Sequence, residues 1–195
     1  MMMSYEESGR TKQKARTRAA LIAATKELLA EGAHPTVEQA AERAEISAST
    51  AYRYFPNRRA LLVATYPEVE LESLLGPEAP ADPIERLDVV LAQLGSFMVA
   101  NEPELRAALR LSLEAPAAGH EPHLRRGRAI RWIEEALEPL APHLDKGELR
   151  RLVLAVRATF GIEALVWLTD VGGLTAEEAV ELMRGSASAL VEAVI

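Results

Sequence analysis

One stretch decides the fold: T-V-E-Q-A-A-E-R-A-E-I-S-A-S-T-A-Y-R-Y-F-P-N-R-R-A-L-L, residues 36–62. Thr36 and Gln39 match a capping box, in which the threonine oxygen accepts a hydrogen bond from an early helical N–H and the glutamine reaches back to the cap. Ser47 is a second N-cap candidate, and Pro56 ends the helix that Ser47 opens, because the residue before a proline avoids the helical region. The stretch predicts two short helices joined by a tight turn, which is a helix-turn-helix.

The apolar residues of this stretch indicate which helix faces are buried. Val37, Ala40, Ala41 and Ala44 recur at helical spacing in the first short helix, and Ala51 and Phe55 do so in the second. Helices this short are not stable alone, so they need tertiary packing. We expect a longer helix over about residues 12–31 to provide that packing. Its predicted buried stripe consists of Ala20, Leu21, Ala24, Leu28 and Leu29.

The block from about Thr17 to Leu62 resembles the N-terminal domain of the tetracycline-repressor (TetR) family of bacterial transcription regulators. The resemblance is densest at Y-R-Y-F-P, which is followed by a polar residue, a basic residue and A-L-L. This chain has Glu45 where many members have a glycine in the turn, and Ser49 where many have a glycine early in the recognition helix. A left-handed backbone at Glu45 would cost free energy, so the resemblance does not fix the geometry of the turn.

The resemblance implies an all-α fold of two domains. Residues 1–60 are expected to form a basic arm and a three-helix helix-turn-helix domain that binds DNA. Residues 61–195 are expected to form a larger helical domain that binds a small effector and dimerises through its last two helices. The sequence contains no convincing strand. Including the helix-turn-helix domain, about nine helices are expected.

Caps and interruptions place the remaining helices, with N-caps predicted at Asn57, Asp82, Asp145 and Thr175. The predicted segments are residues 57–75 with a bend at Pro67, 83–100, 102–113, Pro122 toward Leu140, Asp145 to about Asp170, and Thr175 to the end. The last helix carries an apolar and small-residue face that suits either helix packing between two chains or burial within one chain. Its members are Leu182, Met183, Ser186, Ala189, Leu190 and Ala193.

Side-chain chemistry assigns roles within the expected DNA site. The candidates are Thr36, Ser47, Ser49, Thr50, Tyr52, Arg53, Tyr54 and Arg58. Hydroxyls and free N–H groups at a helix start can contact phosphates or base edges. Arg53 is the first choice for reading a guanine, with a phosphate contact or a solvent position equally open. The resemblance implies that Tyr52 and Tyr54 contact DNA, although tyrosines at helical spacing also suit a core, and that Arg58 takes the place of a phosphate-binding lysine.

Charge is distributed unevenly along the chain. The net charge is −7, yet residues 1–60 hold ten basic and seven acidic residues, a net charge of +3. The other 12 basic and 22 acidic residues give −10. The basic residues near the N-terminus are Arg10, Lys12, Lys14, Arg16 and Arg18. They suit either a phosphate backbone, where counterion release favours binding, or a solvated, disordered arm.

The expected effector site is predicted only from residue type. An apolar pocket between helices needs aromatic and apolar walls with a few polar groups. The candidates are Phe97, Met98, Arg110, Trp132, Phe160, Glu163 and Trp167, each of which also suits a plain core or an interface. Arg157 and Glu163 are charges inside an apolar run and must be paired, exposed or used. They are six residues apart and so should not share a helix face, and a dimer interface suits them as well as a ligand does.

Composition and motifs argue against several classes of site and of protein. Four histidines and no cysteine exclude disulfides and cysteine-ligated zinc, and we expect neither a metal nor a cofactor. His120 and His123 are expected to be solvated. The start of the chain lacks the pattern of a signal peptide, and the apolar run over residues 152–168 is charged and short for a membrane span. A cytoplasmic location without a membrane partner is therefore expected. No nucleotide-binding, metalloprotease or nucleophile-elbow motif is present, so we do not expect an enzyme.

Together these features predict a DNA-binding transcriptional regulator. The leading hypothesis is a repressor that binds a palindromic operator as a homodimer, with half-sites about 34–36 Å apart or a multiple of that. A small-molecule effector would release it by binding one dimer conformation better than another. The alternative is an effector-independent or activating regulator, which the same helix-turn-helix would serve.

Overall fold

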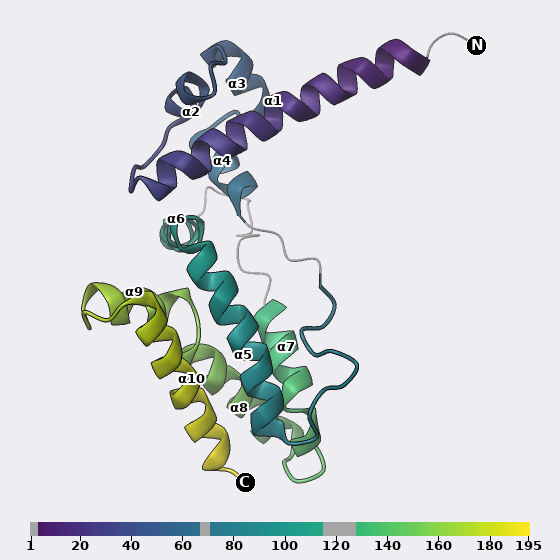
Figure 1. Cartoon of the computed structure of the whole chain (residues 1–195), viewed down its shortest axis with the longest axis vertical. Helices are drawn as coiled ribbons and strands as arrows, with labels where there is room; N and C mark the ends of the chain where they lie inside the picture. The colour runs from purple at the N-terminus through teal and green to yellow at the C-terminus, as the bar shows by residue number, and fades with distance from the viewer. Residues whose placement is uncertain (1–3, 67–70, 115–127) are drawn as a thin grey trace. The chain divides into compact units, whose positions relative to one another are not determined.

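The structure is a computed structural model that describes residues 4–66, 71–114 and 128–195 (Figure 1). These ranges contain helices and no strand, so the predicted all-α class is confirmed. The helices are α1 (Ser4–Ala30), α2 (Val37–Arg43), α3 (Ala48–Tyr54), α4 (Arg58–Thr65), α5 (Pro83–Ala100), α6 (Glu102–Leu113), α7 (Arg128–Ala136), the 3-10 turn η1 (Glu138–Leu140), α8 (Lys146–Thr159), α9 (Ile162–Asp170) and α10 (Ala176–Glu192).

The chain forms two compact units, each of which is discontinuous in sequence. The first takes residues 1–67 and 103–120, and thus contains α1 to α4 and nearly all of α6. The second takes residues 68–102 and 121–195, with α5 and α7 to α10. The predicted domain division after residue 60 stays a prediction.

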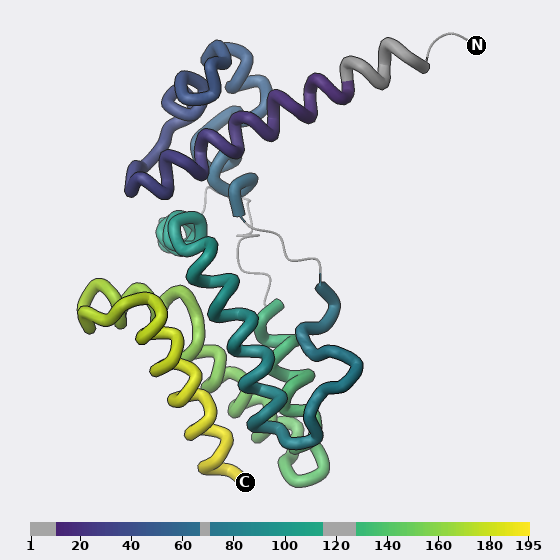
Figure 2. The backbone as a smooth tube through the Cα atoms, viewed as in Figure 1, coloured from purple at the N-terminus to yellow at the C-terminus, as the bar shows by residue number. Residues whose placement is uncertain are grey.

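In the first unit, α1 packs against α2 and α4, and α2 packs against α3. The tube drawing follows this path from α1 through the two short helices to α4 (Figure 2). The core of the unit is made by Leu21, Val37, Ala40, Ala41, Ala51, Phe55 and Leu61. Tertiary packing therefore holds the short helices, as their length requires.

The buried stripe of α1 differs in part from its prediction. Leu21, Ala24 and Leu29 are buried as expected, and Leu28 is half-buried. The prediction for Ala20 is wrong, because this residue is exposed and the buried face begins at Leu21. Thr25 is buried instead, since its hydroxyl donates to the carbonyl oxygen of Leu21 at 2.7 Å and so leaves no unpaired polar atom.

The fourth helix is shorter than predicted. It ends at Thr65, and Tyr66 has φ −58° and ψ 125°, which is not helical. The residue before a proline is pushed out of the helical region, so Pro67 ends the helix here and does not bend it. The predicted continuation to residue 75 is wrong, because residues 71–82 contain no helix.

In the second unit, α5 packs against α7 and α10, while α8 packs against α7 and α10. The core includes Leu87, Leu91, Ile133, Val153 and Met183, all of which are buried. The predicted caps of its helices are present: Asp82 opens α5, and Asp145 and Thr175 open α8 and α10 with capping boxes. The predicted helix start at Pro122 lies outside the described residues.

The apolar helix predicted from Asp145 to Asp170 is two helices, α8 and α9, broken at Phe160 and Gly161. Arg157 crosses this break: its Nη1 donates to the carbonyl oxygen of Phe160 at 3.0 Å and lies 3.6 Å from Glu163 Oε2. A Cβ atom at residue 161 would lie only 2.1 Å from Arg157 Nη1, so this approach needs the glycine. The expectation that Arg157 and Glu163 do not meet is wrong, because it assumed one continuous helix.

Within the described residues, one segment, Lys146–Asp170, has the length and apolar composition of a membrane-crossing helix. A single segment of this kind is a weak indication, because core helices of soluble proteins share both properties. Here the segment is interrupted by the break, and Val153, Val156 and Leu165 on it are buried within the unit.

Candidate nucleic-acid interface

The turn between α2 and α3 is a Schellman motif with a strained residue. The N–H of Ile46 donates to the carbonyl oxygen of Ala41 at 2.8 Å, and the N–H of Glu45 donates to that of Glu42 at 3.1 Å. Glu45 has φ 54°, and among the described residues it is the one non-glycine residue with a positive φ. Gly32 holds the equivalent position after α1 with φ 77°. Glu45 thus adopts the left-handed conformation that glycine adopts more easily.

Three hydroxyls gather at the start of α3. Ser47 is the N-cap, and its Oγ accepts from the N–H of Thr50 at 3.4 Å. The same oxygen donates to Thr50 Oγ1 at 2.8 Å and lies 3.3 Å from Ser49 Oγ. Ser47 and Ser49 are exposed. The structure therefore brings together the three predicted hydroxyls at a helix N-terminus, where backbone N–H groups favour negative charge.

The side chains of α3 divide into a buried and an exposed set. Ala51 and Phe55 are buried in the core, and Tyr54 packs against it half-buried. Arg53 is exposed, and Tyr52 is 41% exposed. The two tyrosines thus occupy different environments, which their residue type alone could not distinguish.

Glu38 in the first turn of α2 is the residue that sequence reasoning missed. Its carboxylate Oε1 accepts a hydrogen bond from the Tyr52 hydroxyl. This bond lowers the pKa of Glu38, as do its own backbone N–H and the Thr36 side chain to a smaller extent, and it raises the pKa of Tyr52. No local sequence pattern predicts this contact, because the two side chains meet only when α2 and α3 are packed together.

Thr36 and Arg58 lie at the starts of α2 and α4. Thr36 completes the predicted capping box: its Oγ1 accepts from the N–H of Gln39 at 3.3 Å, and its own N–H donates to Gln39 Oε1 at 2.9 Å. Arg58 is half-buried, with its Nε donating to the carbonyl oxygen of Pro35 at 3.1 Å and its Nη1 3.9 Å from a Glu114 carboxylate oxygen. Its guanidinium therefore ties α4 to the residue before Thr36.

The basic residues of the N-terminal region lie on α1. The helix begins at Ser4, earlier than predicted, so Lys12, Lys14, Arg16 and Arg18 are helical and the alternative of a disordered arm is wrong for them. All four are exposed. The guanidinium carbon of Arg18 lies 5.6 Å from the centroid of the Phe55 ring, which places this residue beside the end of α3.

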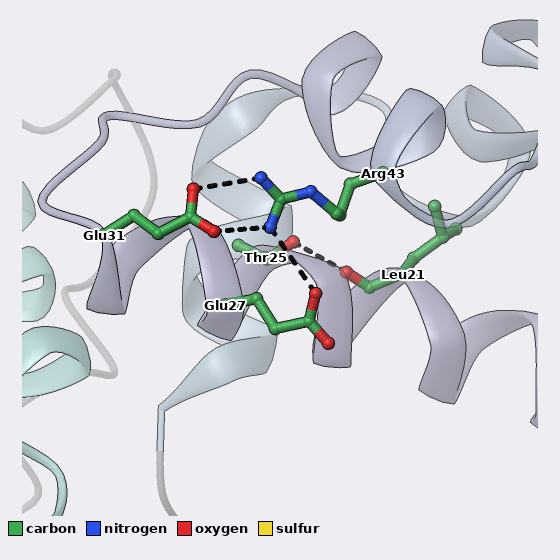
Figure 3. Close-up of polar contacts among 5 residues, drawn as sticks. All are labelled: Leu21, Thr25, Glu27, Glu31 and Arg43. Atoms are coloured by element: carbon green, nitrogen blue, oxygen red, sulfur yellow. Dashed lines mark hydrogen bonds and ion pairs between the residues drawn. The ribbon is translucent and has the colours of Figure 1, made fainter.

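A charged contact fastens α2 to α1 (Figure 3). Arg43 donates from Nη1 and Nη2 to the two carboxylate oxygens of Glu31 at 2.8 and 2.9 Å, and its Nη1 lies 3.5 Å from Glu27 Oε2. The bidentate hydrogen bond lowers the pKa of Glu31 and raises that of Arg43. This geometry fixes orientation as well as distance, so the contact sets how the end of α2 lies against the end of α1.

The predicted effector-binding residues are spread over both units. Arg110 lies in the first unit, exposed on α6, where Nη1 is 3.2 Å from His34 Nε2. The second unit holds the other six, which are Phe97, Met98, Trp132, Phe160, Glu163 and Trp167. Met98, Trp132 and Phe160 are buried, Phe97 and Glu163 are half-buried, and Trp167 is 60% exposed. Their role in effector binding stays a prediction.

A groove of about 520 Å³ lies between α5 and α10, within the second unit. Its walls include Ala92, Gly95 and Ser96 on α5, and Glu177 and Glu181 on α10. None of the predicted effector-binding residues lines it. Among the residues that the structure describes, no group of three or more His, Cys, Asp or Glu side chains could hold a metal ion, and His120 and His123 lie outside them.

Comparisons with known proteins agree with this geometry. Residues 21–65, which contain the end of α1 and all of α2 to α4, match the family model of "Bacterial regulatory proteins, tetR family". The HTH-type transcriptional repressor KstR of Rhodococcus jostii (strain RHA1) is 28% identical over 178 residues, covering 86% of this chain and 82% of that protein. KstR of Mycolicibacterium smegmatis (strain ATCC 700084 / mc(2)155) is 27% identical over 177 residues, covering 86% and 84%. A helix-turn-helix with its polar face exposed, a family match over that region and relatives along most of the chain lead to one conclusion: this chain is a DNA-binding transcriptional regulator whose residues 21–65 form a domain of the tetR family.

Proposed function

We propose that this chain is a transcriptional repressor that binds a palindromic operator as a homodimer and leaves it when a small-molecule effector binds. The observation that carries the proposal is the exposed polar face of α3, where Ser47, Ser49 and Arg53 are accessible while Ala51 and Phe55 hold the helix in the core. Both relatives reported above are named as transcriptional repressors.

On this face, different side chains take different parts of the DNA. Arg53 is the base-reading residue, because a guanidinium pairs with two acceptors of guanine in the major groove. Ser47, Ser49 and Thr50 hold phosphates or base edges at the start of α3, and Thr36 and Arg58 lie where a neighbouring phosphate would pass. The exposed basic residues of α1 add sequence-independent attraction.

Regulators of this family usually form dimers. The exposed surface of α10 supports a dimer through the last two helices. Met183 of the predicted face is buried within the chain, but Leu182, Ser186, Ala189 and Ala193 recur at helical spacing and are exposed. Trp167 and Val171, at the end of α9, are exposed as well. Small and apolar side chains along one face allow a second helix to approach closely.

Effector release then follows from differential binding. A ligand in the second unit that favours one arrangement of the dimer separates the recognition helices from their half-sites. The proposed ligand residues are the predicted set given above. Because its target is DNA, the protein acts in the cytoplasm of a bacterial cell.

The test is selection of binding sites from random duplex DNA with the purified protein, followed by titration of the enriched duplex and a scrambled duplex at several salt concentrations. A palindromic site with a high specificity ratio, bound by two chains, supports the proposal. A small-molecule screen for loss of that complex then tests release. Weak binding that is equal for both duplexes and falls steeply with salt would contradict operator recognition.

A further inference from the structure

The contact between Glu38 and Tyr52 joins the two helices of the helix-turn-helix on its exposed side. Glu38 is exposed in the first turn of α2, and its carboxylate accepts a hydrogen bond from the hydroxyl of Tyr52 on α3. The Thr36 side chain also lowers the pKa of the same carboxylate through a hydrogen bond. One carboxylate thus lies between two of the proposed DNA contacts.

The position of the hydroxyl proton limits what Tyr52 can bind. A tyrosine hydroxyl has a single proton, and once that proton is donated to Glu38, only lone pairs remain. Phosphate oxygens are acceptors, so a tyrosine in this state cannot donate to them. In the major groove, adenine N6 and cytosine N4 carry amino groups that donate. The paired hydroxyl therefore matches an amino group of a base and not the DNA backbone.

We propose that Glu38 is a specificity-determining positioning residue, which by holding the Tyr52 proton makes the Tyr52 hydroxyl an acceptor for a base amino group and withholds it from phosphates. The inference rests on the proposed DNA-binding function. Its second effect is electrostatic, because a carboxylate on this face repels phosphates and weakens sequence-independent binding. Glu38 thus lowers affinity for random DNA and raises discrimination.

The chain offers a matched control for the charge. Glu42 is also exposed and lies one turn further along α2. Glu42→Ala removes the same charge from the same helix without touching Tyr52. The experiment compares the wild type with Glu38→Ala, Glu38→Gln, Tyr52→Phe, Glu42→Ala and the double variant Glu38→Ala plus Tyr52→Phe. It uses the full chain, the duplex enriched by the wild type and a scrambled duplex of equal length.

We expect Glu42→Ala to strengthen binding to both duplexes by the same factor. Glu38→Ala frees the hydroxyl to donate to phosphates, so it should strengthen binding to the scrambled duplex more and reduce the specificity ratio about tenfold, the size of one lost base contact. Glu38→Gln keeps an accepting oxygen and should retain most of the ratio. When Tyr52 is phenylalanine, Glu38 contributes only its charge, so Glu38→Ala should then strengthen binding to both duplexes by the same factor, as Glu42→Ala does.

A second measurement tests the contact without DNA. The ultraviolet absorbance of Tyr52 ionisation, obtained as the difference from Tyr52→Phe, should shift to lower pH in Glu38→Ala, because the carboxylate raises the pKa of this hydroxyl. Circular dichroism checks that each variant is folded. An unshifted titration overturns the inference, as does a Glu38→Ala variant whose specificity ratio equals that of Glu42→Ala. If the wild type enriches no site at all, the proposed function fails and this inference fails with it.

Discussion

The positive φ of Glu45 lowers the stability of the folded chain. A left-handed conformation is unfavourable for a residue with a Cβ, whereas glycine adopts it freely. Glu45→Gly should therefore raise the free energy of unfolding by about 1 kcal/mol. Urea denaturation measures the change. Glu42→Gly, at a helical position, should lower the same free energy by about 0.5–1 kcal/mol. A loss of stability in Glu45→Gly would contradict this explanation of the turn.

Substitution of Arg53 distinguishes recognition of DNA bases from sequence-independent attraction to the DNA backbone. Arg53→Ala should reduce the affinity for the enriched duplex by about 1–3 kcal/mol more than it reduces the affinity for scrambled DNA. Arg58→Ala should weaken binding to both duplexes and reduce the salt dependence, because a phosphate contact carries no sequence information. Equal losses on both duplexes for Arg53→Ala would contradict its role. Fluorescence anisotropy with labelled duplexes gives both affinities.

At the scale of the elements, α5 and α10 approach each other at Gly95. A Cβ atom there would lie 2.5 Å from Val180 Cγ1, and a β-branched side chain in a helix has little freedom to move away. Gly95→Ala should therefore lower the free energy of unfolding by about 1–2 kcal/mol through overpacking.

Gly185 on α10 is the matched control, because a Cβ at this position meets nothing within 4 Å. Gly185→Ala should raise stability by about 0.5–1 kcal/mol, the ordinary gain for this change in a helix. Thermal unfolding of the two variants should give shifts of opposite sign. Shifts of the same sign would mean that the approach at Gly95 does not limit the packing of these helices.

Helix starts could be predicted from the sequence because their signals are local. Thr36, Ser47, Asn57, Asp145 and Thr175 all cap the helices that they were predicted to open. Helix ends and breaks were predicted less well. The apolar periodicity over residues 145–170 continues across Phe160 and Gly161, where the helix breaks. Ala20 suits the buried stripe by residue type and is nonetheless exposed, because burial depends on which face of α1 its partner helices cover.

The same distinction applies to the candidate sites. The DNA-facing residues come largely from one short stretch, so a motif could identify them together. Glu38 was missed because its partner is fourteen residues away on another helix. The effector residues were chosen by type from four predicted helices, and the placement of Arg110 in the first unit shows why residue type does not define a pocket.

The proposed dimer of the whole molecule can be tested at the exposed end of α9. Trp167 is 60% exposed, and a buried tryptophan at the centre of an interface often contributes more than 2 kcal/mol. Trp167→Glu should raise the dimer Kd by at least about tenfold, measured by analytical ultracentrifugation, and should weaken operator binding in parallel. Leu71→Glu is the control, because Leu71 is 55% exposed outside α9 and α10. A dimer unchanged by Trp167→Glu would contradict an interface at this position.

The first unit is completed by α6, which follows α5 of the second unit in the chain. Lys26 Nζ lies 3.4 Å from Glu104 Oε1, and Arg59 Nη1 donates to the carbonyl oxygen of Leu111 at 3.4 Å. During synthesis these partners therefore follow much later than the helix-turn-helix, because Glu104 and Leu111 lie 39 and 46 residues beyond Thr65, where α4 ends. A fragment of the protein that ends at residue 66 would contain the helix-turn-helix. In it, Lys26 would lack Glu104, and Arg59 would lack the carbonyl oxygen of Leu111. Its behaviour on DNA would describe a nascent form of the protein and not the finished one.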